Sequence, residues 1–358
     1  MGWKITKNTA QFQGASWKNL VHKESNCTHE KARRIAFMKT EVTFYFFCRE
    51  YMILEGHGEF VPGDAVFFSG EPWLGSAPQC DTYEKQGVAV VYSNPNNVEE
   101  FKKIATDNIN PDGSSAVDVV CLYAANYCTN EIPMLRANNN SPHTEQPFNE
   151  NIQDVLSSDA VKHLQSKGIV VLLTILNGHS EVGWSQFTCK STAEAFVDYL
   201  NGDVLEKYGL DGIDINDQFS NGTIQSDSLA MVSTVYKQKL PQNLLTKALY
   251  DDLFFFKCEW EGHVLSDNLD YGWQINYYGG GPKERLRPYA DIGMKKNVLV
   301  IGFSANFYYS GWGFPTIGPV MEKTMELGYG GGLLADFEWN PKLIATITNA
   351  IADNKNLV

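Results

Sequence analysis

The chain has 358 residues, of which 43% are hydrophobic and 20% are charged, a balance that supports a sizeable core and excludes global disorder. It carries 42 acidic against 29 basic residues, a net charge of −13. That balance argues against nucleic acid as a partner, because phosphate binding needs a basic surface. No run of about 18 apolar residues occurs, so no membrane-spanning helix is expected.

The aromatic residues and the cysteines give little information about the kind of functional site. The 17 Tyr, 20 Phe and 8 Trp suit sugar rings, but composition alone favours their use in a core. The seven cysteines include no CxxC pair, so no zinc site is expected, and Cys121 and Cys128 are predicted to be buried thiols rather than a disulfide. The start of the chain lacks the apolar stretch of a secretory signal, which is expected to be absent or already removed.

Residues 1–86 predict a separate β-rich module. Aromatic and β-branched runs such as Val42–Phe47 and Val66–Phe68 alternate with Gly and Pro turns, a pattern typical of antiparallel strands. The boundary of this module is expected near Asp81–Gly87, with a second domain over residues 87–358.

From residue 88 the chain alternates short apolar runs with amphipathic stretches. The predicted strands are Val88–Ser93, Ala116–Ala125, Gly168–Leu176, Leu210–Ile215, Leu244–Tyr250, Tyr271–Tyr277, Val298–Ser304 and Gly331–Phe337. Several are continuous apolar runs, as expected of strands buried on both faces.

Helical periodicity fills much of the space between these strands. The predicted helices are Asn151–Ser166, Ser191–Lys207, Met231–Leu240 and Pro319–Leu327, the second with a capping box at Ser191 and Glu194. Eight strands alternating with helices over about 270 residues predict a (β/α)8 barrel. A doubly wound sheet is the structural alternative, but no Gly-rich dinucleotide fingerprint follows the first strand.

The segment Tyr208–Phe219 contains the main chemical signal. In an extended strand, Asp214, Asn216 and Gln218 point to one face while Ile213 and Ile215 point to the other. In a barrel this polar file would face the lumen and emerge at the carboxyl end of the strand, where active sites lie. The alternative is a loop or edge strand with solvated side chains.

This segment resembles the DGxDxDxE signature of family 18 glycoside hydrolases, with Asp211, Gly212 and Asp214 in place. Within that family the chain is most similar to bacterial endo-β-N-acetylglucosaminidases of the endoglycosidase H type. The resemblance spans about 270 residues in order. It includes Val88–Asn97, Ala116–Asn126, Phe148–Gly178, Tyr208–Asp217 and Tyr271–Gly279.

The resemblance implies retaining hydrolysis of the GlcNAc-β-1,4-GlcNAc core of N-linked glycans, with the substrate's own 2-acetamido oxygen as nucleophile. In such a mechanism the Glu of the signature protonates the leaving oxygen, and the Asp two residues earlier orients the acetamide. The expected partner is therefore an N-linked glycan or glycoprotein. Neither a metal nor an organic cofactor is implied.

The chain departs from the family at the two catalytic positions. Asn216 stands at the acetamide-orienting position and Gln218 at the acid/base position, and each is the isosteric amide of the family's acid. Loss of the acid alone is expected to cost about 10²–10⁴ in rate, so the chain is expected to be nearly inactive with its site shape retained. Two explanations remain open: an engineered knock-out that traps a glycan, or a natural pseudoenzyme acting as a lectin.

The resemblance also suggests further site residues. Tyr277, or Tyr278 one position on, matches a tyrosine that hydrogen-bonds the acetamide, and Asp217 points away from the catalytic file and is expected to be structural. The candidates for substrate contact are Asp211, Asn126, Asn177, Gln274, Asn276, Trp273 and Trp339. For the tyrosine and both tryptophans, core packing is the alternative. His179 is expected to be a solvated loop residue.

Residues 1–86 show a weaker second resemblance, to aegerolysins, which are small β-sandwich proteins that bind membrane lipids. It rests on Gly14–Lys18, on the stretch from Cys48-Arg49 to Gly58–Phe60, and on Pro72–Ser76. It implies a membrane lipid as a partner of this module. The alternatives are a module that packs on the barrel or one that binds glycan.

Overall fold

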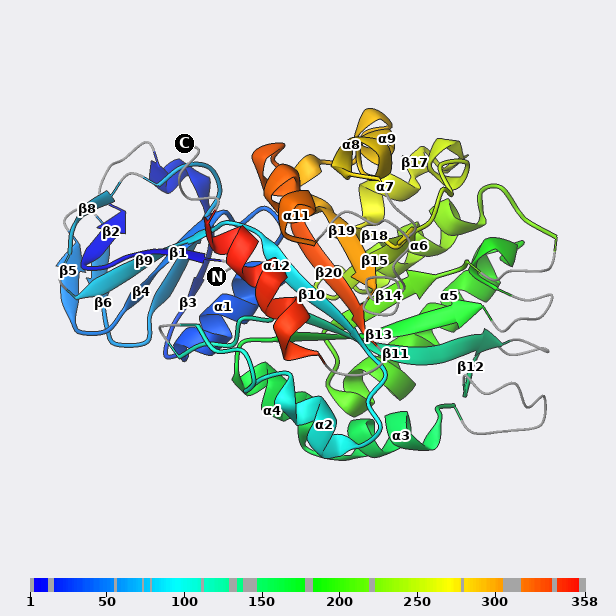
Figure 1. Cartoon of the computed structure of the whole chain (residues 1–358), viewed down its shortest axis with the longest axis horizontal. Helices are drawn as coiled ribbons and strands as arrows, with labels where there is room; N and C mark the ends of the chain where they lie inside the picture. The colour runs from blue at the N-terminus through cyan, green and yellow to red at the C-terminus, as the bar shows by residue number, and fades with distance from the viewer. Residues whose placement is uncertain are drawn as a thin grey trace.

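The structure is a computed structural model that describes residues 3–11, 16–54, 57–72, 74–77, 79–110, 113–128, 134–137, 147–177, 183–218, 223–277, 280–304, 317–336 and 340–353. It contains a parallel barrel and an antiparallel sheet beside it (Figure 1). Within the described ranges no helix is long and apolar enough to cross a membrane.

Eight parallel strands close into a (β/α)8 barrel, which confirms the predicted fold class. In chain order they are β10 (Val88–Ser93), β11 (Val119–Cys128), β13 (Val170–Asn177), β14 (Gly212–Asn216), β15 (Leu244–Leu249), β18 (Tyr271–Gln274), β19 (Leu299–Ser304) and β20 (Gly331–Asp336). The ring closes because β10 pairs in parallel with both β11 and β20. A short strand, β12 (Met134–Ala137), runs antiparallel to the end of β11.

Helices surround the barrel strands. The longer ones are α2 (Val98–Lys103), α3 (Glu150–Ser157), α4 (Ala160–Ser166), α5 (Lys190–Tyr199), α6 (Ser228–Lys239), α11 (Ile317–Glu326) and α12 (Pro341–Asp353). Shorter elements are η2 (Trp184–Gln186), η4 (Phe255–Lys257), β16 (Glu259–Trp260), β17 (His263–Val264), α7 (Leu265–Asn268), α8 (Pro282–Arg285), α9 (Arg287–Asp291) and η5 (Lys296–Val298).

Two predicted helices differ in detail. The stretch 151–166 forms two helices, α3 and α4, because the chain leaves helical geometry at Ser158, whose backbone is extended. The stretch 191–207 begins one residue earlier, with Cys189 at the N-cap, so the predicted capping box at Ser191 is wrong. Helix α5 then continues as the π-helical segment η3 (Leu200–Glu206).

The N-terminal segment forms a five-stranded antiparallel sheet in the order β1 (Trp3–Thr6), β9 (Cys80–Lys85), β4 (Phe44–Cys48), β7 (Ala65–Phe68) and β3 (Leu20–Glu24). Two small pairs join it: β2 (Thr9–Gln11) with β8 (Leu74–Ser76), and β5 (Met52–Leu54) with β6 (Gly58–Phe60). The segment also contains η1 (Ser16–Asn19) and α1 (His29–Met38), a helix that the sequence analysis did not predict. Its N-cap Thr28 accepts a hydrogen bond from the Lys31 backbone N–H.

Alternation along β4 gives this sheet two apolar faces. Tyr45 joins the large core that continues into the barrel, whereas Phe44 and Phe46 join a second, smaller core with Phe60 and Phe68. Helix α1 contacts β4 and β7 on one side and α4 and β13 on the other, so it lies between the sheet and the barrel (Figure 1).

Two arginines of α1 fix the sheet to the amino end of the barrel. The buried Arg33 guanidinium pairs with Asp118, which precedes β11, and donates to the Ser115 carbonyl. Arg34 donates through Nε to Asp211 Oδ1 at 3.0 Å, just before β14. The Arg33–Asp118 pair is fully buried and Arg34 is half-buried, so removal of Asp118 alone would leave a buried charge without its partner.

Candidate active site

The inner face of β14 places Asp214 and Asn216 in the barrel lumen, while Ile213 and Ile215 pack in the surrounding core. Asp214 is fully buried and accepts hydrogen bonds from hydroxyls on three other strands. Tyr92 Oη on β10 donates at 2.8 Å, Thr174 Oγ1 on β13 at 3.0 Å and Thr246 Oγ1 on β15 at 2.7 Å. Donors from across the ring can converge on one carboxylate only inside the barrel.

The environment of Asp214 favours its protonated form. Burial raises the pKa of this carboxyl to about 6, although the hydrogen bonds from Thr246, Tyr92 and Thr174 oppose the shift. Neutral hydroxyls stabilise a carboxylate less than a cation does, so they offset only part of the cost of desolvation. Asp214 therefore holds a proton in mildly acidic solution.

Asn216 and Gln218 lie at the carboxyl end of the same strand. The Asn216 side chain is buried and its Oδ1 accepts a hydrogen bond from the Gln218 backbone N–H at 3.3 Å. The Gln218 side chain is exposed, just beyond the strand end. A side-chain amide has no proton acidic enough to transfer to a leaving group, so these two positions can bind and orient a ligand but cannot supply general acid catalysis.

Tyrosines enclose the space around Asp214. Tyr277 follows β18 and is half-buried. Burial raises the pKa of its phenol, and the charges of Tyr123 and Asp214 add to this shift. Burial and Asp214 raise the pKa of Tyr123 to about 12, and the rings of Tyr92 and Tyr123 lie 5.9 Å apart. All three phenols therefore stay protonated and can donate hydrogen bonds. Tyr278 lies outside the described residues.

Asn126 at the end of β11 shares a row with Asn216, because Asn126 pairs in register with Leu176 and Leu176 pairs with Asn216. Its side chain is buried, with Nδ2 at 3.5 Å from the Ala137 carbonyl, and its Oδ1 has no hydrogen-bond partner among the described residues. A buried acceptor of this kind has capacity for a ligand hydroxyl or amide. The structure thus brings Asn126 to the same rim as Asn216.

Asn177, at the end of β13, instead makes hydrogen bonds to protein groups through both its Oδ1 and its Nδ2 atoms. It is buried, its Oδ1 accepts from the Trp184 backbone N–H at 2.9 Å, and its Nδ2 donates to the Asp217 carbonyl at 2.7 Å. This amide ties the turn between Asn216 and Gln218 to the neighbouring loop. The placement does not support the predicted glycan contact and favours a positioning role.

Asp211 lies at the opposite end of β14 from Asn216. It is buried and its carboxylate accepts hydrogen bonds from the Val171 backbone N–H, Gln165 and Arg34. The structure does not bring it to the site, because the amino end of a parallel strand lies across the barrel from the carboxyl end. The predicted substrate contact of Asp211 is therefore not supported, and its carboxylate anchors α1 to the barrel instead.

Of the candidates on and after β18, Trp273 points into the lumen and Gln274 points outward to Arg285 of α8, so the predicted place of Gln274 in the floor of the site is not supported. Trp273 is fully buried, donates through Nε1 to Thr246 Oγ1 at 3.1 Å and stacks on Tyr271, so it forms part of the lumen core and exposes no face to a sugar. Gln274 is also buried, and its Oε1 accepts from Arg285 Nε at 2.6 Å. Asn276 is half-buried at the rim. Trp339 and His179 lie outside the described residues.

The hydroxyl donors to Asp214 and a buried ion cluster behind the site were not predicted from the sequence. Lys247, fully buried on the outer face of β15, donates through Nζ to Asp217 Oδ1 at 2.9 Å and pairs with Asp252. Tyr250 Oη also donates to Asp217 Oδ1, at 2.7 Å. Asp217 thus faces outward, as alternation predicts. Thr174, Thr246 and Lys247 could have been identified from the sequence, because each is a polar residue within an otherwise apolar strand.

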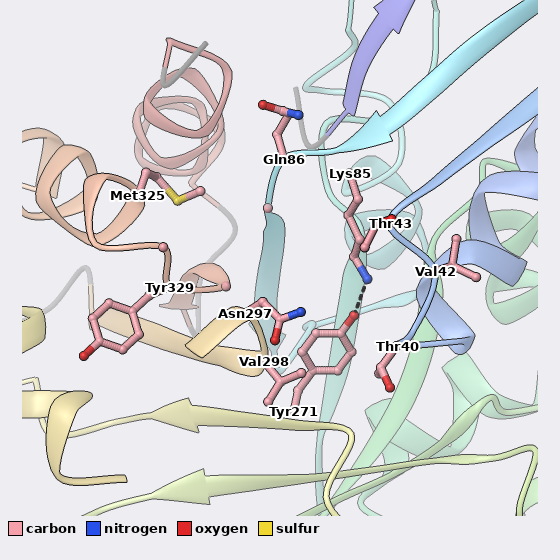
Figure 2. A pocket seen from close by; sticks show the side chains of 13 residues that line it. Thr40, Val42, Thr43, Lys85, Gln86, Tyr271, Asn297, Val298, Met325 and Tyr329 are labelled. Atoms are coloured by element: carbon pink, nitrogen blue, oxygen red, sulfur yellow. Dashed lines mark hydrogen bonds between the residues drawn. The ribbon is translucent and has the colours of Figure 1, made fainter. Parts of the chain in front are cut away.

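A cavity of about 240 Å³ lies at the other end of the barrel, where it meets the N-terminal sheet (Figure 2). Its lining includes Thr43 and Lys85 from that sheet's side and Tyr271 and Asn297 from the barrel. Lys85 Nζ donates to Tyr271 Oη at 2.6 Å. The described residues contain no group of three or more His, Cys, Asp or Glu side chains that could hold a metal ion.

Among the curated proteins similar to this chain are two endo-β-N-acetylglucosaminidases. The chain is 32% identical over 177 residues to an endo-β-N-acetylglucosaminidase of Flavobacterium sp. (strain SK1022), covering 47% of this chain and 52% of the relative. It is 28% identical over 216 residues to endo-β-N-acetylglucosaminidase F1 of Elizabethkingia meningoseptica, covering 54% and 59%. The chain therefore spans little more than half the length of these curated relatives. No family model matches it.

Solved structures share the fold at low identity. The Bacteroides thetaiotamicron protein EndoBT-3987, solved with a Man5GlcNAc product, superposes with a TM-score of 0.54 at 15% identity, covering 94% of this chain and 85% of that one. The chitinase RmChi1 of Rhizomucor miehei superposes with a TM-score of 0.54 at 13% identity, covering 74% and 99%.

Coverage distinguishes these two matches. Residues 87–358 are 272 of 358 residues, or about 76% of the chain, so the 94% match with EndoBT-3987 extends over much of residues 1–86 as well. The chitinase match covers no more of the chain than a barrel alone would occupy. Both likenesses establish that the chain folds as a (β/α)8 barrel.

Proposed function

We propose that the chain is an endo-β-N-acetylglucosaminidase-type protein that binds the GlcNAc-β-1,4-GlcNAc core of N-linked glycans at the carboxyl end of its barrel. The observation that carries this proposal is the file on β14, with buried Asp214 below Asn216 and exposed Gln218 beyond it. Two endo-β-N-acetylglucosaminidase relatives and a fold shared with an endoglycosidase bound to Man5GlcNAc support it.

In this proposal each residue of the site has a distinct task. Asn216 holds the 2-acetamido group of the sugar at the cleavage point, and the protonated phenol of Tyr277 donates to the acetamide oxygen. Gln218 stands where a general acid would protonate the leaving oxygen. Asp214 provides a polar group beneath Asn216. The Oδ1 atom of Asn126 accepts a hydrogen bond from a hydroxyl or amide of the glycan.

We further propose that this chain binds glycan without hydrolysing it at an appreciable rate. An amide at position 218 removes proton transfer, worth about 10²–10⁴ in rate. An amide at position 216 removes a charge that would stabilise the oxazolinium-like transition state, worth about 10²–10³ more, although the two losses need not multiply. Both an engineered knock-out and a natural glycan-binding pseudoenzyme are compatible with these two amides.

Reversion tests the proposal. The chain as it stands, the single variants Asn216→Asp and Gln218→Glu, and the double variant are incubated with a high-mannose glycopeptide, and released glycan is quantified. We expect no turnover from the parent and hydrolysis at least 10³-fold faster from the double variant. The control is Gln242→Glu, an exposed glutamine on the turn before β15 at the amino end of the barrel, which should leave the rate unchanged.

A calorimetric titration of the parent with the same glycopeptide separates the two proposed parts. Binding without turnover, followed by activity in the double variant, supports an endoglycosidase whose acids have been replaced. Binding in both proteins without activity in either supports a lectin-like pseudoenzyme. If the parent neither binds nor cleaves the glycopeptide and the double variant is also inert, the proposed substrate is wrong.

For residues 1–86 we propose an accessory module that braces the barrel, with the glycosidase-type domain over residues 87–358. The buried Arg33–Asp118 pair and the position of α1 between sheet and barrel support bracing over membrane binding. Co-sedimentation of the full chain with vesicles of phosphatidylcholine, sphingomyelin and cholesterol tests the lipid alternative. Recovery of the chain in the vesicle pellet would contradict the bracing role as the sole function.

A further inference from the structure

Strands β4 and β9 of the N-terminal sheet bring two cysteines directly opposite each other. Cys48 pairs in register with Cys80 on the antiparallel neighbour, although the two are 32 positions apart in the chain. Both side chains are fully buried, and their Sγ atoms lie 2.8 Å apart. All seven cysteines lie within the described residues, and among them only this pair is in sulfur–sulfur contact.

The hydrogen-bond pattern of the ladder shows which kind of pair this is. Lys85 N donates to the Thr43 carbonyl and Arg49 N donates to the Gln79 carbonyl, both at 2.7 Å. Bonded and non-bonded pairs alternate along an antiparallel ladder, so Cys48 and Cys80 occupy a non-hydrogen-bonded position. At such positions the Cα atoms approach to about 4.5 Å, within the range that a disulfide spans.

The sulfur atoms are sealed in the smaller core of the module. Cys48 and Cys80 pack with Phe46, Phe60 and Met52, and Met52 Sδ lies 3.2 Å from Cys80 Sγ. The hydrogen bond with Cys80, together with burial, raises the pKa of the Cys48 thiol. The thiolate that attacks in disulfide exchange is therefore scarce in the folded module, and reagents cannot reach it.

From this arrangement we propose that Cys48 and Cys80 form a cross-strand disulfide that closes the chain around β5, β6, β7 and β8. The bond forms while the strands pair and the core is still open. One cysteine thiolate attacks a low-molecular-weight disulfide, giving a mixed disulfide and one released thiol. The second cysteine thiolate then displaces the other small thiol, so two protein thiols lose two protons and two electrons and the small disulfide is reduced.

The site also explains why the bond, once formed, is stable. Its sulfurs are covered by the same aromatic side chains that block access to the thiols, so reduction by a soluble thiol requires the module to open. The remaining cysteines stay as thiols. Cys27 and Cys121 are buried in the larger core, Cys128 and Cys258 are half-buried, and Cys189 is exposed.

Counting thiols tests the proposal. The full chain is refolded with a mixture of reduced and oxidised glutathione, quenched with acid, unfolded and alkylated, and its mass is measured with and without reduction. We expect five of the seven cysteines to be alkylated before reduction and all seven after it. Peptide mapping of the unreduced sample should recover one cross-linked species, joining the peptides of Cys48 and Cys80.

Two variants provide matched controls. Cys48→Ser should give six alkylated cysteines with or without reduction, and Cys27→Ser, which removes a buried thiol of the larger core, should give four before and six after. Seven alkylated cysteines in the unreduced parent, or a cross-link that joins any other pair, overturns the proposal. If Cys48→Ser does not fold, the peptide map of the parent chain still decides the question.

Discussion

Two lysines at opposite ends of the barrel, Lys247 fully buried and Lys85 half-buried, have contrasting surroundings. Behind the candidate site, Lys247 lies between the carboxylates of Asp217 and Asp252. At the joint with the N-terminal sheet, Lys85 donates to the neutral phenol of Tyr271 and faces the rings of Phe37 and Tyr271, with centroids at 4.8 and 5.3 Å (Figure 2).

The pKa values of the two amines diverge accordingly. Burial alone lowers the pKa of either ammonium group. For Lys247 the charges of Asp217 and Asp252 outweigh burial and the pKa is raised, whereas for Lys85 burial prevails and the pKa falls to about 8. The protein therefore compensates the ammonium charge of Lys247 beside the turn before Gln218, whereas at Lys85 the charges of Asp118 and Glu41 offset only part of the effect of burial.

The largest expected effect comes from breaking the compensated cluster. Lys247→Met leaves Asp217 and Asp252 buried without their cation, so the free energy of unfolding should fall by about 3–5 kcal/mol. Adding Asp217→Asn and Asp252→Asn to this variant should recover part of the loss, because both uncompensated charges are removed. Urea unfolding followed by circular dichroism measures each step.

Lys257→Met, at an exposed lysine on η4, is the matched control and should change the free energy of unfolding by less than about 0.5 kcal/mol. If both substitutions lowered the free energy of unfolding by a similar amount, the ion pairs of Lys247 with Asp217 and Asp252 would contribute no more to stability than an exposed lysine does. In the Asn216→Asp, Gln218→Glu background, Lys247→Met should also lower the hydrolysis rate more than it raises KM, since Asp217 lies between the two reverted positions.

Asp214 extends the comparison to a carboxylate with only neutral hydrogen-bond donors. Its pKa is raised from 3.8 to about 6, so between these pH values the folded state binds a proton that the unfolded state has lost. Stability therefore falls as pH rises from 4 through 6, by about 2 kcal/mol for this group. In Asp214→Asn this fall should be absent. The free-energy difference between parent and variant should thus favour the parent by about 2 kcal/mol more at pH 4 than at pH 7.

Asp154→Asn, at an exposed position on α3, provides the control for general effects of pH on folding. Parallel pH curves for the parent and Asp214→Asn would show that Asp214 is ionised at pH 4 in the folded protein, and that its hydroxyl partners compensate for burial fully.

Features set by one strand could be predicted from the sequence, whereas contacts between strands could not. The strands and the file of Asp214 and Asn216 follow from local patterns, because alternation within an apolar run fixes which side chains share a face. Asp211 was misplaced because proximity in the signature says nothing about which end of a strand a side chain occupies. The partners of Asp214 lie on three other strands, and Lys247 pairs with Asp217, 30 positions away; such long-range pairings leave no local signature.

Helix α1 is a second feature that the local sequence did not reveal. Its apolar face, with Ala32, Ala36 and Phe37, is readable as helical, but the flanking β pattern dominated the interpretation of residues 1–86. What the helix does could not be read locally at all, because Arg33 and Arg34 pair with acids 85 and 177 positions away. Its role as the contact between sheet and barrel emerges only from the folded arrangement.

The smallest and oppositely signed effect is expected at Lys85. The unfolded chain keeps this proton to about pH 10.5, whereas the folded chain releases it near pH 8, so stability rises with pH across that interval. Lys85→Met should abolish the rise and increase the free energy of unfolding at pH 7 by about 1 kcal/mol, a modest gain because the side chain is partly solvated and loses its bond to Tyr271.

Urea unfolding at pH 7 and pH 9.5 measures both quantities, with Lys18→Met on η1 as the exposed control. A destabilisation at pH 7 as large as that of Lys247→Met would contradict the contrast, because it would mean that the Lys85 ammonium is compensated in the folded protein as fully as that of Lys247.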